Sequence, residues 1–240
     1  MAFAPVLHAE WLKIRTLRAL PGTLLALFAA TTTFSALAAS SDSSEPDSDP
    51  LFTALSGVLP GQIAAIAFGA MAVSSEFPGG LRLSLSAVPR RGRWFAAKAV
   101  AVALPALAVG LVTALAALLV GRAGLGSAAD GLTPGEQARG VVGCGVYLML
   151  MALFAAGLTA LLRSGLAALS LLIPLVVVVS FVIGDAAGTA ADFLPDRAGQ
   201  VVMRETYDAA LGPWTGLAVT ALWTTGALLA GAWSVRRRDA

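Results

Sequence analysis

The chain has 240 residues, of which 58% are hydrophobic and only 12% are charged, and its mean hydropathy is +0.82. This composition excludes a soluble domain with an ordinary charged surface and indicates a chain that lies in lipid. One histidine and one cysteine offer too few ligands for a zinc site, and Cys144 has no partner for an internal disulfide.

Residues 5–19 form the first predicted element, a short amphipathic helix that lies along the membrane surface. Its apolar side chains recur at helical spacing, at Leu7, Trp11, Ile14 and Leu17. Its charged side chains at Glu10, Lys13 and Arg18 face elsewhere. Trp11, Lys13, Ile14 and Arg15 are its candidate functional residues. The alternative is that these residues are only a basic flank of the first span.

Six apolar runs without Asp, Glu, Lys, Arg or His follow, at residues 20–39, 51–73, 99–121, 140–162, 165–184 and 213–235. Each is close to the roughly 20 residues that span a bilayer as a helix. In lipid every backbone polar group must be paired internally, so these runs are predicted to be helices. The predicted fold class is therefore an all-α polytopic membrane protein, with residues 1–240 as a single domain.

The charged residues predict the orientation of these six spans. Segments on the side of the N-terminus carry 12 Lys and Arg against three acids, whereas the opposite segments carry four against 11. The positive-inside rule then places both ends in the cytoplasm. Arg163 belongs in a tight turn between the fourth and fifth spans, because at mid-membrane it would cost roughly 2.5–3.5 kcal/mol. The pI near 9.1 thus reflects orientation, and no nucleic acid is implied.

Small residues and prolines mark particular spans. Gly57, Gly61, Ala65 and Gly69 recur every four residues in the second span, a stripe that favours close helix packing. Pro60, Pro105 and Pro174 each remove a backbone hydrogen bond and favour a kink. Residues 185–212 mix apolar and charged side chains. They are predicted to form one or two short helices that re-enter the membrane from the outer side, with a simple loop as the alternative.

The cytoplasmic segment 74–98 is the predicted attachment point for a partner. Glu76 is followed by a Pro-Gly-Gly turn, an apolar stretch and a basic cluster. Leu81, Leu85 and Val88 share one face of a short helix, although strand alternation also fits residues 81–85. The alternative role is a basic loop that only binds lipid head groups.

Catalytic chemistry is not predicted for this chain. The longest inner connection has 25 residues, too few for an enzyme domain, and no phosphate-binding loop of the G-x-x-x-x-G-K-[S/T] type occurs. The spans also lack the ionisable groups that proton-coupled carriers use. We therefore expect any energy for transport to come from a partner.

The chain resembles the membrane subunit of type-2 ATP-binding-cassette (ABC) exporters, a permease family common in actinobacteria. The resemblance covers essentially the whole chain. It rests on Glu-Trp-Leu-Lys-Ile-Arg-Thr at residues 10–16, on Leu-Gly-Pro-Trp-Thr-Gly at residues 211–216 and on the closing Arg-Arg-Arg-Asp-Ala. It also rests on Glu76 followed by Gly79, Gly80, Leu81, Arg82, Pro89, Arg90 and Arg91.

The resemblance implies that residues 5–19 are a connecting helix and that residues 80–88 are a coupling helix docking on a separate ATPase. The residues implied in coupling are Glu76, Gly79, Gly80, Leu81, Arg82, Leu85, Val88, Pro89, Arg90 and Arg91. ATP and magnesium would bind that partner, and this chain would carry no cofactor, metal or catalytic residue. A second permease copy, identical or different, would complete a transporter in the plasma membrane.

The predicted function is export of an amphipathic or hydrophobic substrate. Two alternatives remain from the sequence. A channel or ion-coupled carrier would act without an ATPase, and a non-transporting sensor or assembly component would bind an ATPase but move nothing.

Overall fold

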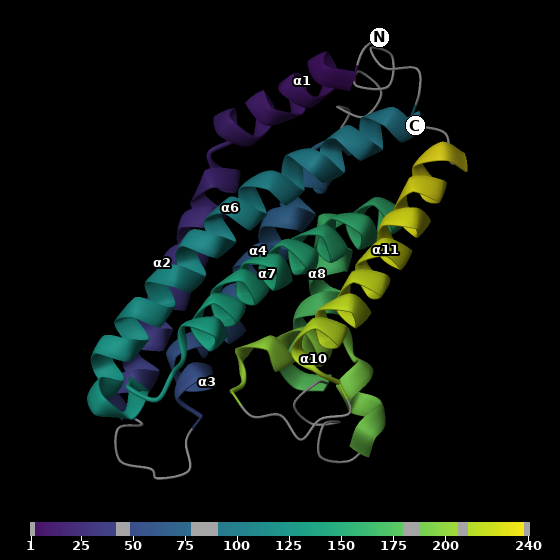
Figure 1. The fold of residues 1–240 in the computed structure, drawn as a ribbon. Helices are drawn as coiled ribbons and strands as arrows, with labels where there is room; N and C mark the ends of the chain where they lie inside the picture. The colour runs from purple at the N-terminus through teal and green to yellow at the C-terminus, as the bar shows by residue number, and fades with distance from the viewer. Residues whose placement is uncertain (1–2, 42–48, 78–90, 180–187, 206–210, 238–240) are drawn as a thin grey trace.

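A computed structural model describes residues 3–41, 49–77, 91–179, 188–205 and 211–237. In these segments the chain is helical and contains no strand, so the predicted all-α class is confirmed there. Both ends of the described chain lie at one end of the bundle, at the top of Figure 1.

The long helices are α2 (Ala19–Ser41), α4 (Val58–Ser74), α6 (Arg91–Leu125), α7 (Pro134–Leu162) and α11 (Pro213–Arg237). With α3 (Pro50–Leu55) continuing into α4, they give five helical segments long and apolar enough to cross a membrane. The chain is therefore a multi-pass membrane protein. Helix α8 (Gly165–Pro174) and the π-helical turn η2 (Leu175–Val179) form a shorter apolar helix, and residues 180–184 of the predicted span lie outside the described residues.

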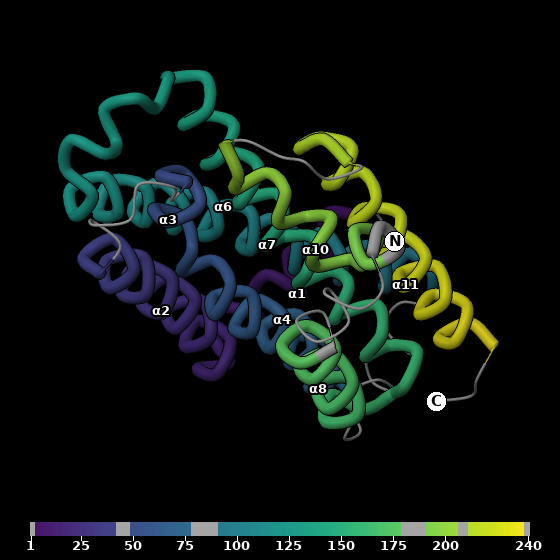
Figure 2. Tube along the Cα trace, turned by 90° about the horizontal axis from the view of Figure 1, so that it is seen from below, coloured from purple at the N-terminus to yellow at the C-terminus, as the bar shows by residue number. Residues whose placement is uncertain are grey.

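Helix α7 forms the centre of the bundle, and α4, α6 and α11 pack around it (Figure 2). On its inner side Cys144, Tyr147, Leu148 and Met151 are fully buried. Large apolar side chains on the outer helices point away from the bundle, including Leu25, Leu166 and Leu222. A hydrocarbon environment stabilises this outward apolar surface, which water would not.

Two helices begin earlier than hydropathy alone predicts. Helix α6 starts at Arg91 rather than near residue 99, so the last part of the predicted segment 74–98 is helical. Helix α7 starts at Pro134 rather than near residue 140, where Thr133 and Glu136 cap each other's backbone groups. Both extensions carry charges, because a helix can continue beyond the stretch that a bilayer requires to be apolar.

The predicted turn at Arg163 is confirmed. Helix α7 ends at Leu162, and Arg163 adopts a left-handed conformation with a φ of 54°. The Ser164 hydroxyl then accepts a hydrogen bond from the Ala167 amide at 3.2 Å and caps α8. A basic residue therefore lies between two apolar helices rather than inside one.

Prolines coincide with irregular backbone at two of three positions. The helix is interrupted between α3 and α4 shortly before Pro60, and the π-helical turn η2 follows Pro174. Helix α6, by contrast, runs through Pro105 without interruption. Beyond η2 the chain forms η3 (Gly188–Phe193), α10 (Pro195–Gln200) and η4 (Val201–Met203), so short helices rather than a simple loop occupy the described part of residues 185–212.

The small-residue stripe lies against other helices of the same chain. A side chain at Gly57 or Gly61 would meet Thr31 of α2, and one at Gly69 would meet the backbone of Ala152 in α7. Ala65, between them, is 1% exposed. The stripe thus allows α4 to approach α2 on one side and α7 on the other.

We expect Gly69→Ala to lower the free energy of unfolding by about 1–3 kcal/mol, because its methyl group would overpack the contact with Ala152. Gly226→Ala in α11 is the matched control, since no heavy atom lies within 4 Å of the added carbon. Denaturant unfolding of both variants in the same micelles gives the comparison. A Gly69→Ala variant as stable as wild type would show that the contact can relax.

Candidate functional site

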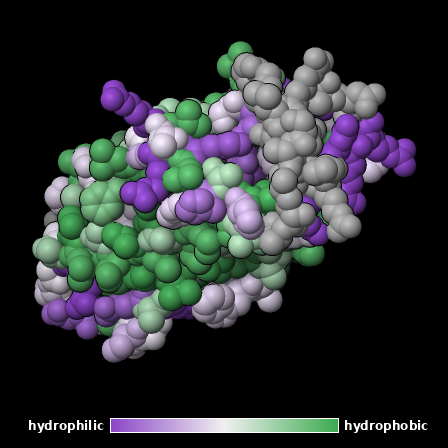
Figure 3. Space-filling view, turned by 90° about the horizontal axis from the view of Figure 1, so that it is seen from above, coloured by the Kyte–Doolittle hydropathy of each residue, from purple (hydrophilic) through white to green (hydrophobic). Residues whose placement is uncertain are grey.

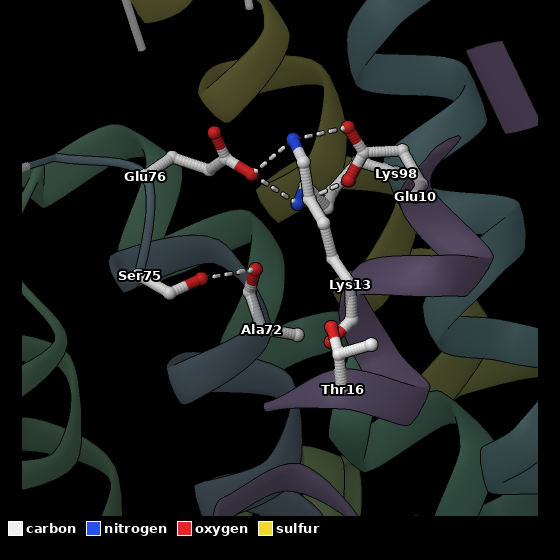
Figure 4. Close-up of polar contacts among 7 residues, drawn as sticks. All are labelled: Glu10, Lys13, Thr16, Ala72, Ser75, Glu76 and Lys98. Carbon is white, nitrogen blue, oxygen red and sulfur yellow. Dashed lines mark hydrogen bonds and ion pairs between the residues drawn. The ribbon is translucent and has the colours of Figure 1, made fainter. Parts of the chain in front are cut away.

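Four charged side chains from three segments of the chain meet in one cluster (Figure 4). Glu10 and Lys13 come from α1 (Phe3–Thr16), Glu76 follows α4, and Lys98 lies in the first turns of α6. We call Glu10, Lys13, Glu76 and Lys98 the charge ring.

Local structure places each member of the ring. Glu10 and Lys13 are three residues apart on α1, so both side chains reach the same side of that helix. Glu76 is held in a turn in which its amide donates to the Val73 carbonyl at 3.2 Å. Lys98 lies one helical turn after Trp94 on the buried face of α6.

Each lysine bridges both carboxylates. The Lys13 ammonium donates to Glu10 Oε1 at 2.9 Å and to Glu76 Oε1 at 2.7 Å. The Lys98 ammonium donates to Glu76 Oε1 at 2.8 Å and also pairs with Glu10 Oε2. Signs therefore alternate around the ring, and its four formal charges cancel.

The ring is buried although it consists of charges. Glu10, Lys98 and Glu76 are only 2%, 3% and 4% exposed, and Lys13 covers the side nearest to solvent. Removing one ion from water costs several kcal/mol, which here is compensated only because each charge has two opposite neighbours. Loss of any one member would leave an unbalanced charge in the interior.

Burial and pairing act in opposite directions on the pKa of Glu76. Burial raises it, but the positive charge of Lys98 and hydrogen bonds from Lys13 and Lys98 lower it more, to about 2. Burial lowers the pKa of Lys13, but hydrogen bonds to Glu76 and Glu10 raise it by a larger amount, so the net shift is upward. Both groups are therefore ionised at neutral pH, and the ring is suited to holding segments together rather than to exchanging protons.

An apolar cluster lies beneath the ring. Trp94 is 1% exposed. Lys98 Nζ lies 5.8 Å from the centre of the Trp94 indole, within the range of a cation–π interaction. Val6, Val73, Phe95 and Val235 pack in the same cluster. The charge ring thus joins α1, the end of α4 and the start of α6. The apolar cluster next to it also includes the end of α11.

Two residues of the ring, Glu76 and Lys98, belong to the segment 74–98 that is predicted to couple to a partner. Glu76 precedes the implied coupling helix, residues 80–88, and Lys98 follows it, and each pairs with a side chain of α1. Gly79, Gly80, Leu81, Arg82, Leu85, Val88, Pro89 and Arg90 lie outside the described residues. Arg91 begins α6 and donates to the Val235 carbonyl at 3.2 Å, which ties α6 to the end of α11.

The face of α1 that packs on the bundle differs from the apolar stripe found in the sequence. The structure buries Val6, Glu10 and Ile14, whereas Trp11 is 38% and Leu17 is 41% exposed. Arg15 is also exposed. Glu10 therefore points into the protein, and of the four residues in the stripe only Ile14 is buried.

Sequence reasoning selected Lys13 and Glu76 but missed Glu10 and Lys98. The sequence did contain a signal for Glu10. The segments on the side of the N-terminus carry only three acids against 12 bases, and two of those acids, Glu10 and Glu76, are in the ring. Figure 3 views the molecule from the end at which both termini lie, and hydrophilic side chains interrupt its largely hydrophobic surface there.

A scan against models of protein families finds no match, and neither does a search of curated proteins. Within the described segments, no group of three or more His, Cys, Asp or Glu side chains is placed to hold a metal ion. The charge ring is therefore interpreted from its own geometry.

Proposed function

We propose that this chain is the permease subunit of a type-2 ABC exporter, driven by ATP hydrolysis on a separate subunit. The observation that carries the proposal is that two members of the charge ring, Glu76 and Lys98, lie on either side of residues 80–88. A force applied to those residues would reach α4 and α6 along the chain and α1 through the ring, because Glu76 and Lys98 both pair with side chains of α1.

The proposed topology has six spans with both ends in the cytoplasm. The span beyond the five long segments comprises α8, η2 and residues up to 184. The 12-to-4 distribution of basic residues supports this orientation. Helix α1 would lie at the cytoplasmic membrane surface, with Trp11 toward lipid and Glu10 toward the ring; its oblique angle to α2 in Figure 1 supports such a placement.

In this mechanism the permease supplies no chemistry of its own. ATP and magnesium bind the partner, whose closure displaces residues 80–88, and the ring transmits the displacement to the spans. Two permeases, identical or different, and two ATPases would form the unit in the plasma membrane. An amphipathic or hydrophobic substrate would cross between the two permeases.

Replacing residues 80–88 with a Gly-Ser linker of equal length should abolish ATPase binding. We expect the tagged wild-type chain, purified from membranes of its own cells, to retain a co-purifying ATPase, and the variant to lose it while still inserting. A Gly-Ser replacement of residues 42–48, on the opposite side, is the control. Retained ATPase would contradict the coupling role, and a complex that hydrolyses ATP without any flux would favour the sensor or assembly alternative.

A further inference from the structure

A cavity of about 370 Å³ lies in the half of the bundle remote from the charge ring. It is formed by the first turns of α4, the π-helical turn η2 and the short helix α10. Its polar lining residues are Gln62, Asp196, Arg197 and Gln200. Its apolar wall includes Leu59, Ile63, Val176 and Val177. Its volume falls within the range of roughly 300–1,000 Å³ typical of small-molecule sites, near the lower limit.

Irregular backbone borders this cavity at two places, and the short helix α10 closes a third side. The α3–α4 interruption precedes Leu59, the π-helical turn supplies Val176 and Val177, and α10 is a single short helix. At membrane depth, non-helical backbone is tolerated where it lines a cavity, and interrupted spans often form the binding sites of transporters. The coincidence of two irregular segments at one cavity indicates a binding site.

Buried hydrogen bonds fix the two amides of the wall. The Tyr147 hydroxyl, fully buried in α7, donates to Gln62 Oε1, and Gln200 Nε2 donates to the Tyr147 oxygen at 3.5 Å. Gln62 is 4% exposed. An amide carries both a donor and an acceptor, so these side chains can contact a polar ligand in addition to Tyr147.

Charges of both signs line the same cavity. Asp196 is 1% exposed and Arg197 is half-buried, and they are neighbours on α10. A carboxylate accepts at about four positions and a guanidinium donates through five N–H groups, so each can bind a ligand in addition to a protein partner. A zwitterion can place its ammonium group beside the carboxylate and its carboxylate beside the guanidinium, so each side chain gains an opposite charge.

We propose that this cavity binds a small zwitterion with apolar side groups, of the chemical class of an apolar dipeptide. The ammonium group contacts Asp196, the carboxylate contacts Arg197, and the apolar groups pack on Leu59, Ile63 and Val176. The site does not depend on the exporter assignment, because binding to this chain alone requires no ATPase.

Equilibrium binding to the full chain in nanodiscs tests the proposal with radiolabelled Leu-Leu as the probe. N-acetyl-Leu-Leu-amide, which keeps the apolar groups and removes both charges, is the matched compound. We expect saturable binding of Leu-Leu and at least about tenfold weaker competition by the capped compound, because two charged hydrogen bonds are lost. Absence of saturable binding, or equal affinity for the two compounds, would overturn the proposal.

Two kinds of variant locate the binding. Asp196→Asn and Arg197→Gln should each weaken Leu-Leu binding about tenfold or more. If either fails to fold, Val177→Trp provides an independent test, because Val177 lines the cavity and its side chain is 48% exposed, which leaves room for the change. Val178→Trp is its control, since Val178 is 53% exposed and does not line the cavity. Binding that survives Val177→Trp, or that both tryptophans abolish, would contradict the site.

Discussion

Replacing Glu76 with glutamine should lower the free energy of unfolding by about 3–5 kcal/mol. The change leaves the buried Lys98 and the partly exposed Lys13 around a single carboxylate, so the ring gains a net positive charge. Glu136→Gln is the matched control, because Glu136 is a partly exposed carboxylate outside the ring, in a capping box that glutamine can also form. Denaturant unfolding of the purified proteins in mixed micelles gives both values.

A second substitution should restore much of that loss. In Glu76→Gln/Lys98→Met the remaining Glu10 and Lys13 again balance, and methionine fills the apolar space beside Trp94. The double-mutant cycle should therefore show a coupling energy well above the roughly 0.3–0.5 kcal/mol error typical of independent sites. Additive losses would show that the two residues stabilise the protein separately and that no ring exists.

The stability lost by Glu76→Gln should also depend on pH in a defined direction. The pKa of Glu76 in the folded protein, about 2, is below its ordinary value of about 4.3. Its contribution is therefore complete above that ordinary value and is lost as the pH falls toward 2. Wild type and variant should differ by a constant amount between about pH 6 and 9 and should converge in strong acid.

The five long apolar helical segments were predictable because each of their apolar runs carries its own signal. The requirement that backbone groups in lipid be paired within one segment makes a single run sufficient to predict a helix. The break at Arg163 was predictable for the same reason, since a charge inside a span is costly. The starts of α6 at Arg91 and α7 at Pro134 were not predicted, because hydropathy reports the lipid-buried part of a helix and not its extension beyond.

The burial of Glu10 could not be predicted from helical spacing. In a water-soluble protein an apolar stripe faces the core, but next to a bilayer part of it can face lipid, so that the face contacting protein can include a charged residue. Trp11 and Leu17 are apolar, yet both remain exposed on the isolated chain. The spacing of α1 therefore indicates which side is apolar, but it does not say which side contacts the rest of the protein.

The ring and the cavity depend on contacts between distant parts of the sequence. Glu10 and Lys98 meet only when α1 crosses α6, and Gln62 is linked to Gln200 only through Tyr147. No local pattern encodes such a meeting. What the sequence did contain was the rarity of acids on the basic side, which made Glu76 conspicuous and should equally have marked Glu10.

If the exporter proposal holds, Glu76→Gln/Lys98→Met should separate ATPase binding from conformational change. Residues 80–88 are intact in this variant, so the ATPase should still co-purify in wild-type amount. The double variant weakens the ionic contacts that connect that segment to α1. We therefore expect the ATP-dependent fluorescence change at the opposite end of the bundle to fall about tenfold, equivalent to a coupling free energy of about 1.4 kcal/mol. A fluorophore on Ser41→Cys, an exposed position at the end of α2, reports the response.

The same label in a Glu136→Gln background controls for a general effect of removing a carboxylate. Cys144 is buried and should not react with the label. Loss of the ATPase together with the signal would make the ring part of the docking surface rather than a transmitter. An undiminished signal with the ATPase bound would mean that the force reaches the spans by another route. The neutral glutamine and methionine of the double variant cannot reproduce the attraction that holds α1 to residues 76 and 98.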